Sequence, residues 1–327
     1  MKKCIRGLAL LLALMLFAGC ATAETGADNQ GEYLLTSEMS EGVKSDIDAI
    51  TDAFLTALEA NDASKITEYL DRNIAVSVEE LNTFFTEATA GDKAKYEVFD
   101  TYYVDGVKYN DVMVRIKKNH DAKEYIMITP GSDEICAVLL VSENEGLSQM
   151  ITLLIGEVAG GKKIVWIDTS DYKYYGKTAP EYYELSKAAR EDGREYSAYV
   201  YAQMMYGTLR PGNIYHFEET DTMEDYAHEI SAWGQDKFPL EVGNYKIHAF
   251  NTGLEEGAVI PLVLYQTDVD ISSEKFTDDV KALKDALIEK YPYLAEDFDK
   301  IIVRGTNADP QTASEQVESE KVVFDLK

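Results

Sequence analysis

Nine of the chain's 22 tyrosines lie within the 35 residues from Tyr172 to Tyr206, and Trp166 lies just before them. An aromatic ring can stack on a sugar or a peptide while its hydroxyl or N–H group makes a hydrogen bond. Trp166, Tyr172, Tyr174 and Tyr175 are therefore candidate ligand-binding residues for a glycan or a peptide. The alternative is that these rings pack against a sheet and expose only their hydroxyl groups.

Asp268 and Asp270 form a second candidate site. They lie two residues apart at the expected end of a strand, which would place both carboxylates on one side, about 6 to 7 Å apart. Such a pair could bind Ca²⁺, which prefers oxygen ligands, or hydrolyse a glycoside, which uses two carboxyl groups about 5 to 9.5 Å apart. The chain has no D-x-D-x-D-G loop, and acid pairs arise freely among 59 acidic residues. We therefore favour solvation at a strand end and expect no bound metal and no cofactor.

The other residues capable of chemistry do not form a known catalytic motif. The four histidines fall in separate segments: His120, His216, His228 and His248. None has the i, i+4 spacing of a metal-binding helix. Ser272–Lys275 matches S-x-x-K, but its companion S-D-N and K-T-G motifs are missing, so we expect Ser272 or Ser273 to cap a helix. The catalytic residues of any enzymatic activity are unknown, and a non-enzymatic role is preferred.

Residues 1–19 combine a basic start, a run of twelve mostly apolar residues and small residues at the end, which indicates a secretory signal. The run is shorter than the ~20 residues of a membrane-spanning helix. Leu16–Cys20 resembles a bacterial lipobox, which implies cleavage before Cys20 and a diacylglycerol on its thiol. The mature chain would then lie on the outer face of the cell membrane. The alternative is cleavage after the A-x-A site Ala21–Ala23, which would secrete the chain.

The formal net charge is −28, and removal of the three basic residues of the signal leaves −31. An acidic surface disfavours nucleic acid and anionic lipid as partners, because both are bound by basic patches. A neutral or cationic ligand remains open. Of the three cysteines, Cys4 leaves with the signal and Cys20 carries the lipid. Cys136 then lies alone in an apolar run, where we expect a buried small hydrophobe and no disulfide.

The lipidated N-terminus is followed by a tether and then by helices. Residues 20–44 are polar, acidic and aperiodic, which predicts a flexible connection of ~25 Å reach. Three helices are expected next, beginning at residue 45, at 63–70, and after a capping box formed by Ser77 and Glu80.

Alternating apolar runs then predict strands up to residue 170. They read KYEVFDTYYV, DVMVRIKK, EYIMIT, ICAVLLV, ITLLIGEV and KKIVWIDT. The turns between them are short, as at Ala159–Gly161, so the sheet should be largely antiparallel.

Two further regions complete the chain. Residues 171–215 predict a helical hairpin, with Pro180 in the first turn and a break at Asp192-Gly193. Residues 216–327 predict a smaller α+β domain whose amphipathic helix spans 274–291.

The order of elements in residues 45–170 resembles the nuclear transport factor-like (SnoaL-like) cone fold, in which helices precede a curved antiparallel sheet. Members of that fold hold small ligands, pair through the open sheet face, or carry an acid-base pair. The segments DYKYYGKTAPEYYELSKAAREDG, LRPGNIYHFEE, KFPL and VIPLVLYQT, within residues 162–270, are similar to uncharacterised lipoproteins of Gram-positive bacteria. Neither resemblance implies one activity, so no functional residue is carried over.

The sequence therefore predicts an α+β lipoprotein with a cone-like domain at 45–170, a helical hairpin and a second α+β domain. Its expected function is non-catalytic binding of a neutral or cationic ligand, such as a glycan or a peptide. Two alternatives stay open: a carboxylate-dependent hydrolase with its site in the cone, and a structural surface protein that forms a homodimer.

Overall fold

The computed structural model describes residues 33–35, 39–74, 76–88, 95–105, 113–118, 122–310 and 318–327. Within these residues the fold is α+β, with largely antiparallel sheets and several helices, which confirms the predicted fold class. The predicted signal segment 1–19, Cys20 and His120 lie outside the described residues. None of the described helices has both the length and the apolar character that crossing a membrane requires.

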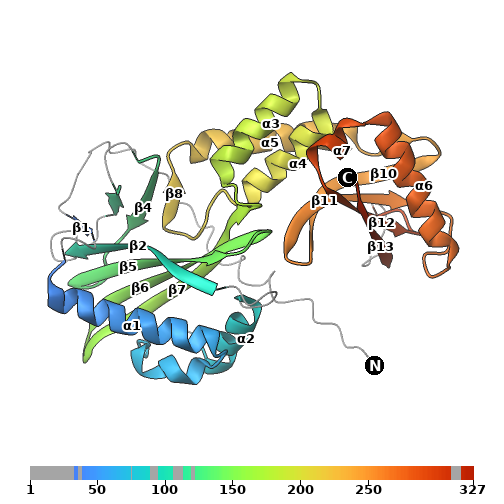
Figure 1. Ribbon diagram of the computed structural model, residues 1–327. Helices are drawn as coiled ribbons and strands as arrows, with labels where there is room; N and C mark the ends of the chain where they lie inside the picture. Colours follow the sequence, from blue (N-terminus) through green and yellow to red (C-terminus); the bar gives the residue numbers. More distant parts are fainter. Residues whose placement is uncertain are drawn as a thin grey trace. The chain divides into compact units, whose positions relative to one another are not determined.

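The first sheet has, within the described residues, five strands in the order β1-β2-β5-β6-β7, with antiparallel neighbours (Figure 1). They are β1 Tyr33–Leu35, β2 Lys95–Asp105, β5 Glu134–Glu143, β6 Leu147–Val158 and β7 Gly161–Tyr174. The run ICAVLLV in β5 is apolar throughout because both faces of the sheet are covered. Cys136, Val138 and Leu140 belong to one buried cluster, and Ala137 and Leu139 belong to another.

Three helical segments pack on one face of this sheet (Figure 1). They are α1 Glu41–Glu59, the 3₁₀ helix η1 Ala63–Tyr69 and α2 Val78–Ala88. The predicted capping box is present at α2, where the Ser77 N–H donates to Glu80 Oε2 at 2.8 Å and the Glu80 N–H donates to Ser77 Oγ at 3.2 Å. The rings of Phe54 and Phe85 meet edge to face at 5.5 Å and join α1 to α2.

The segment expected to be a flexible tether, 20–44, contains structured parts. Tyr33–Leu35 pairs with β2, and α1 begins at Glu41, earlier than expected. The early start has a local cause, because the Ser40 hydroxyl accepts a backbone N–H of the first turn at 3.4 Å. The helix expected at 63–70 is present as a 3₁₀ helix.

Two strands expected in the first sheet form a separate one. β3 (Val114–Ile116), β4 (Glu124–Ile128) and β8 (Tyr215–Phe217) pair antiparallel in the order β3-β4-β8. Ile126 of β4 lies opposite Tyr215. No local pattern predicts this pairing, because the two strands are far apart along the chain.

The central helices include one that the sequence did not predict. They are α3 Ala179–Glu191, α4 Glu195–Gly207 and α5 Thr220–Lys237. α3 and α4 form the predicted hairpin, in which the Ser186 hydroxyl donates to the Ala198 carbonyl at 2.7 Å. Along α5 the buried positions include the small residues Ala227 and Gly234, so its apolar stripe is weak. Gly234 is required by packing, since a Cβ there would lie 2.3 Å from the Tyr199 ring.

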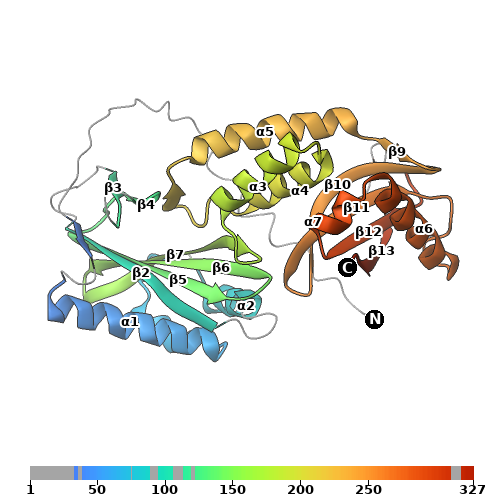
Figure 2. The same ribbon diagram turned by 45° about the horizontal axis from the view of Figure 1, so that its top comes forward.

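The C-terminal sheet has the order β13-β12-β11-β10-β9 (Figure 2). Its strands are β9 Leu240–Val242, β10 Tyr245–Glu255, β11 Ala258–Gln266, β12 Lys300–Thr306 and β13 Ser319–Asp325. β11 and β12 are parallel, and their crossover contains α6 (Lys275–Lys290) and α7 (Tyr293–Asp297). The buried stripe of α6 is the predicted one: Phe276, Val280, Leu283 and Leu287.

The prediction that Ser272 or Ser273 caps α6 was wrong. Glu274 occupies the N-cap position and makes no side-chain cap. Both serine hydroxyls donate instead to Asp270, one to its carboxylate at 2.7 Å and the other to its carbonyl at 2.6 Å. The two serines therefore stabilise a tight turn before the helix and do not cap it.

Candidate functional site

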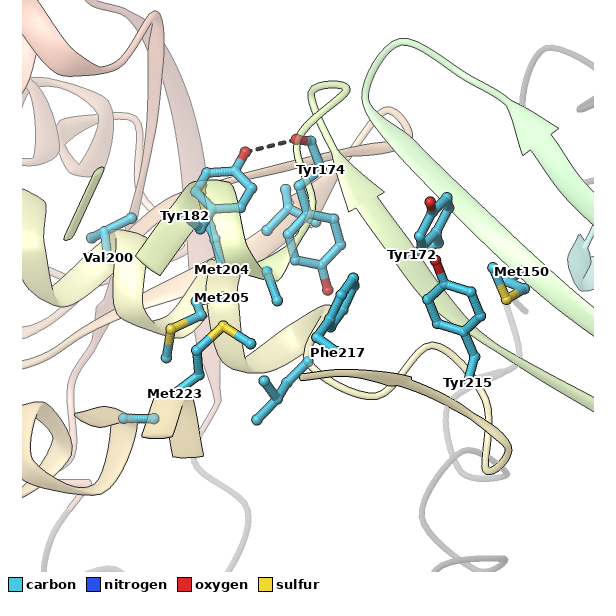
Figure 3. Close-up of a cluster of buried hydrophobic side chains, with 14 of the residues drawn as sticks. Met150, Tyr172, Tyr174, Tyr182, Val200, Met204, Met205, Tyr215, Phe217 and Met223 are labelled. Atoms are coloured by element: carbon cyan, nitrogen blue, oxygen red, sulfur yellow. Dashed lines mark hydrogen bonds between the residues drawn. The ribbon is translucent and has the colours of Figure 1, made fainter. Parts of the chain in front are cut away.

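The four candidate aromatic residues do not form one surface. Tyr172 and Tyr174 lie on the same face of β7, are only 5% and 6% exposed, and point into the core (Figure 3). Tyr172 packs edge-on against Tyr215, with ring centroids 5.9 Å apart. Trp166 is half-buried against the same core. Of the four, only Tyr175 is exposed, at 42%.

Tyr175 lines a cleft bounded by the α3–α4 hairpin, β11 and the end of α7. Its volume is about 270 Å³. We call this cavity the aromatic cleft. Its wall is formed mainly by four rings and one carboxylate: Tyr175, Tyr182, Tyr201, Phe298 and Asp297. Aliphatic side chains of α3, α4 and β11 complete it, so this is an apolar hollow with few polar groups, as small-molecule sites usually are.

Tyr175 reaches the cleft from a tight turn between β7 and α3. Tyr174 and Lys177 close the turn with two backbone hydrogen bonds of 3.0 and 2.9 Å. The two central residues, Tyr175 and Gly176, have φ values of +49° and +71°. Turns with two positive φ values favour Asn-Gly, and a bulky residue pays about 1–2 kcal/mol for the left-handed conformation. A tyrosine in this position is therefore strained, and it lies at the rim of a cavity.

The inner rings are fixed by contacts with one another and with the backbone. Tyr201 lies 6.2 Å from Tyr182 and 5.2 Å from Phe298, measured between ring centroids. The Tyr182 hydroxyl donates to the Tyr174 carbonyl at 2.7 Å (Figure 3). Burial, reinforced by the negative charge of Asp297, raises the pKa of Tyr201 to about 12. These hydroxyls are therefore neutral at physiological pH.

Asp297 supplies the buried polar group of the cleft. Its side chain is 10% exposed, and its Oδ1 forms an ion pair with Arg194, which also contacts Asp192 at 3.2 Å. Its Oδ2 is buried without a hydrogen-bond partner. Leaving a buried acceptor unpaired costs about 1–3 kcal/mol, so a turn of the carboxylate that brings Oδ2 to the cleft surface and pairs it with a ligand donor would be favourable.

The rim of the cleft carries charges of both signs. Lys177, Asp299 and Lys300 are exposed there. Asp299 forms an ion pair with Lys327 at 2.7 Å. Burial, with the nearby charge of Asp299, raises the pKa of Tyr175. The cleft thus offers aromatic faces, one inner carboxylate and a charged, exposed rim.

No protein-family model matches this chain, and no curated protein is similar to it at a significant level. A solved structure from Nostoc punctiforme, a domain of unknown function with a cystatin-like fold, is similar over 48% of this chain and 95% of its own. Its sequence identity is 10% and its TM-score is 0.26. A likeness at this level carries no conclusion about fold or function.

The acid pair predicted from the sequence does not lie on a strand. β11 ends at Gln266, and both Asp268 and Asp270 are exposed in the turn that follows. Asp270 accepts hydrogen bonds from the hydroxyl and the backbone N–H of Ser272, which hold its pKa below the usual value. Within the described part of the chain, no three histidine, cysteine or acidic residues are grouped for a metal ion.

The described histidines also lie apart. His216 stacks on Tyr125 at 5.4 Å, His228 lies on α5, and His248 is buried in β10. Cys136 is 2% exposed with a free thiol, and burial raises its pKa, which agrees with the predicted structural role.

Asp297, the acid of the cleft, is not predicted from the sequence. Asp297 ends a helix of five residues, and nothing local separates it from the other acidic residues of the chain. The rim residue left a weak signal in the sequence. The dipeptide Tyr175-Gly176 occupies a tight turn whose two positive φ values would favour Asn-Gly.

Proposed function

We propose that this chain is a lipoprotein anchored through a diacylated Cys20 to the outer face of a bacterial cell membrane, and that its folded part is a non-catalytic binding protein. The aromatic cleft is the binding site, and its ligand is neutral or cationic. The observation that carries the proposal is the cavity lined by four aromatic rings and by Asp297, whose buried Oδ2 has no hydrogen-bond partner.

The geometry of the cleft supports binding. Its rings are held in place before a ligand arrives, which reduces the entropy that binding would otherwise lose. The one unpaired acceptor gives the ligand an orientation. An anionic group would meet the Asp297 carboxylate in a chain of net charge −28, so anions are disfavoured.

Neither alternative function has a comparable supporting observation in the described residues. A hydrolase that uses a carboxylic acid needs a carboxyl group with a raised pKa. The described carboxyl groups with shifted pKa values have them lowered, as in Glu134, whose hydrogen bond from Lys162 favours the charged form. The hydrolase with its site in the cone stays an untested prediction, and so does the homodimeric surface protein.

A ligand screen tests the binding proposal. The mature chain, extracted from membranes in mild detergent, is titrated with neutral sugars, primary amines and short cationic peptides while its melting temperature is measured. We expect at least one neutral or cationic probe to raise the melting temperature, and the increase to shrink in Asp297→Asn. Failure of every probe in the wild-type chain would overturn the proposal.

The anchor is tested separately, by intact mass spectrometry of the chain recovered from cells. We expect a polypeptide that begins at Cys20 and carries the mass of a diacylglycerol in the membrane fraction. Recovery from the medium of a chain that begins at Glu24, without a lipid, would refute the anchor and leave the binding proposal standing.

A further inference from the structure

The charges around the aromatic cleft cancel. Asp297 and Asp299 supply two negative charges to its lining, and Lys177 and Lys300 supply two positive charges. Asp297 is already paired with Arg194, and Lys300 lies 3.8 Å from Glu256. A cationic ligand would gain little from an acid that already has its counter-ion, and an anionic ligand would face an unpaired carboxylate oxygen. The balance favours a ligand without net charge.

The polar groups of the cleft favour a ligand that both donates and accepts hydrogen bonds. Asp297 Oδ2 is an acceptor that needs a hydroxyl or amide N–H. The ammonium groups of Lys177 and Lys300, at the rim, are donors only. A ring that bears several hydroxyl groups can serve the inner acceptor and the outer donors at once.

The aromatic rings of the cleft favour a ligand that also has an apolar face. Tyr175 is 42% exposed at the rim, and Tyr201 and Phe298 lie 5.2 Å apart in the wall. The C–H face of a sugar ring is apolar, while its edges carry hydroxyl groups. A volume of about 270 Å³ is below the ~300–1,000 Å³ of sites for drug-sized ligands, so one ring enters and the rest of a longer chain stays outside.

From these features we infer that the aromatic cleft takes a single uncharged sugar ring, with the C–H face against Tyr175 and one ring hydroxyl donating to Asp297 Oδ2, which is buried in this structure and turns toward the cleft when the sugar binds. This inference rests on the proposed binding function and adds the chemical class of the ligand. Tyr175 keeps its strained conformation because the ring at that position covers the sugar. A glycan presented outside the cell can supply such a terminal ring.

Sugars that share one ring size and differ in charge give the sharpest test. The mature chain is titrated by calorimetry with glucose, N-acetylglucosamine, cationic glucosamine and anionic glucuronate, together with leucine and cyclohexylamine. We expect a neutral sugar to bind at least several-fold more tightly than the charged sugars. Saturation-transfer NMR should place the protein nearest the C–H face of the bound ring.

Two variants locate the binding. Asp297→Asn keeps the shape of the side chain but can present an N–H where the carboxylate has Oδ2, and it should weaken neutral-sugar binding by roughly 10-fold or more. Tyr175→Asn should weaken it about 3- to 10-fold without touching the Asp297–Arg194 pair. The matched control is Tyr206→Ala, which removes a 53% exposed ring of α4 outside the cleft and should leave affinity unchanged.

The outcomes are distinct. Binding of leucine or cyclohexylamine but of no neutral sugar would overturn the sugar assignment and leave the proposed binding function intact. Binding of no probe at all would overturn both. Sugar binding that is lost in Tyr206→Ala but kept in Tyr175→Asn would refute the cleft as the site.

Discussion

Tyr175 occupies a backbone conformation that a smaller residue would adopt at lower cost. The same turn geometry recurs between β10 and β11, where Glu256 and Gly257 have φ values of +50° and +77°. At both turns a residue other than Asn precedes the glycine. Only Tyr175, however, places a large ring on the wall of a cavity that also holds an unpaired carboxylate oxygen.

Replacing Tyr175 by asparagine should therefore raise the free energy of unfolding. We expect a gain of about 0.5–1 kcal/mol, because asparagine tolerates the left-handed region and the lost ring is only half-buried. Urea denaturation of both chains measures the difference. Glu256→Asn is the matched control for the turn conformation and should give a similar gain in stability. A drop in stability for Tyr175→Asn would mean that packing of the ring outweighs its strain.

His248 gives a second prediction at the scale of a single residue. It sits at a bulge of β10, where the register with β11 shifts between Ile247 and Ala249. Its side chain is 1% exposed, and its Nδ1 lies 3.6 Å from Asp309 Oδ1. Burial lowers its pKa, and of the charged groups facing it Asp309 opposes this shift while Lys246 reinforces it.

A lowered histidine pKa means that the unfolded chain binds the proton more readily than the folded chain. Stability should therefore fall as pH drops below about 6.5, the ordinary value. Chemical denaturation between roughly pH 7.5 and 5.5 should show a shallower decline for His248→Leu than for the wild-type chain. His216, whose pKa burial also lowers, accounts for part of the decline that remains. Equal declines in the two chains would contradict this role of His248.

At the scale of elements, close approach of α4 and α5 depends on one glycine. Gly234→Ala would place a methyl group 2.3 Å from the Tyr199 ring, so we expect a loss of about 1–3 kcal/mol in the free energy of unfolding. Gly42 in α1 has nothing within 4 Å of the same added atom. Gly42→Ala should therefore raise stability by about 0.5 kcal/mol. A stable Gly234→Ala chain would show that the two helices can move apart.

Sequence patterns predicted some elements of this fold and not others. α1 and α6 were predicted because large apolar residues recur at helical spacing, as with Phe276, Val280 and Leu283. α5 was missed because two of its buried positions, Ala227 and Gly234, carry little or no side chain, which leaves a weak apolar stripe. The pairing of β4 with β8 was missed for another reason, since it joins distant segments and leaves no local signal.

At the scale of the whole molecule, the site was predicted only in part. Tyr175 was named among the aromatic candidates, but Tyr172 and Tyr174 are core residues because alternate strand positions face the interior. Asp297 joins the cleft from α7, across a fold that brings it beside α3 and α4. Among the 59 acidic residues, Asp297 differs by its position in the cleft. That position depends on contacts between distant segments, which residue spacing does not predict.

The charge of the whole chain gives the last prediction. A body of net charge −28 concentrates cations around itself at low ionic strength, and salt screens that attraction, with a Debye length of ~30 Å at 0.01 M and ~3 Å at 1 M. A neutral sugar in the aromatic cleft gains nothing from this field. Its dissociation constant should stay within about twofold between roughly 0.02 and 0.5 M sodium chloride, whereas that of glucosamine should rise. A neutral sugar whose affinity collapsed with salt would show that the rim lysines, rather than Asp297 and the rings, dominate binding.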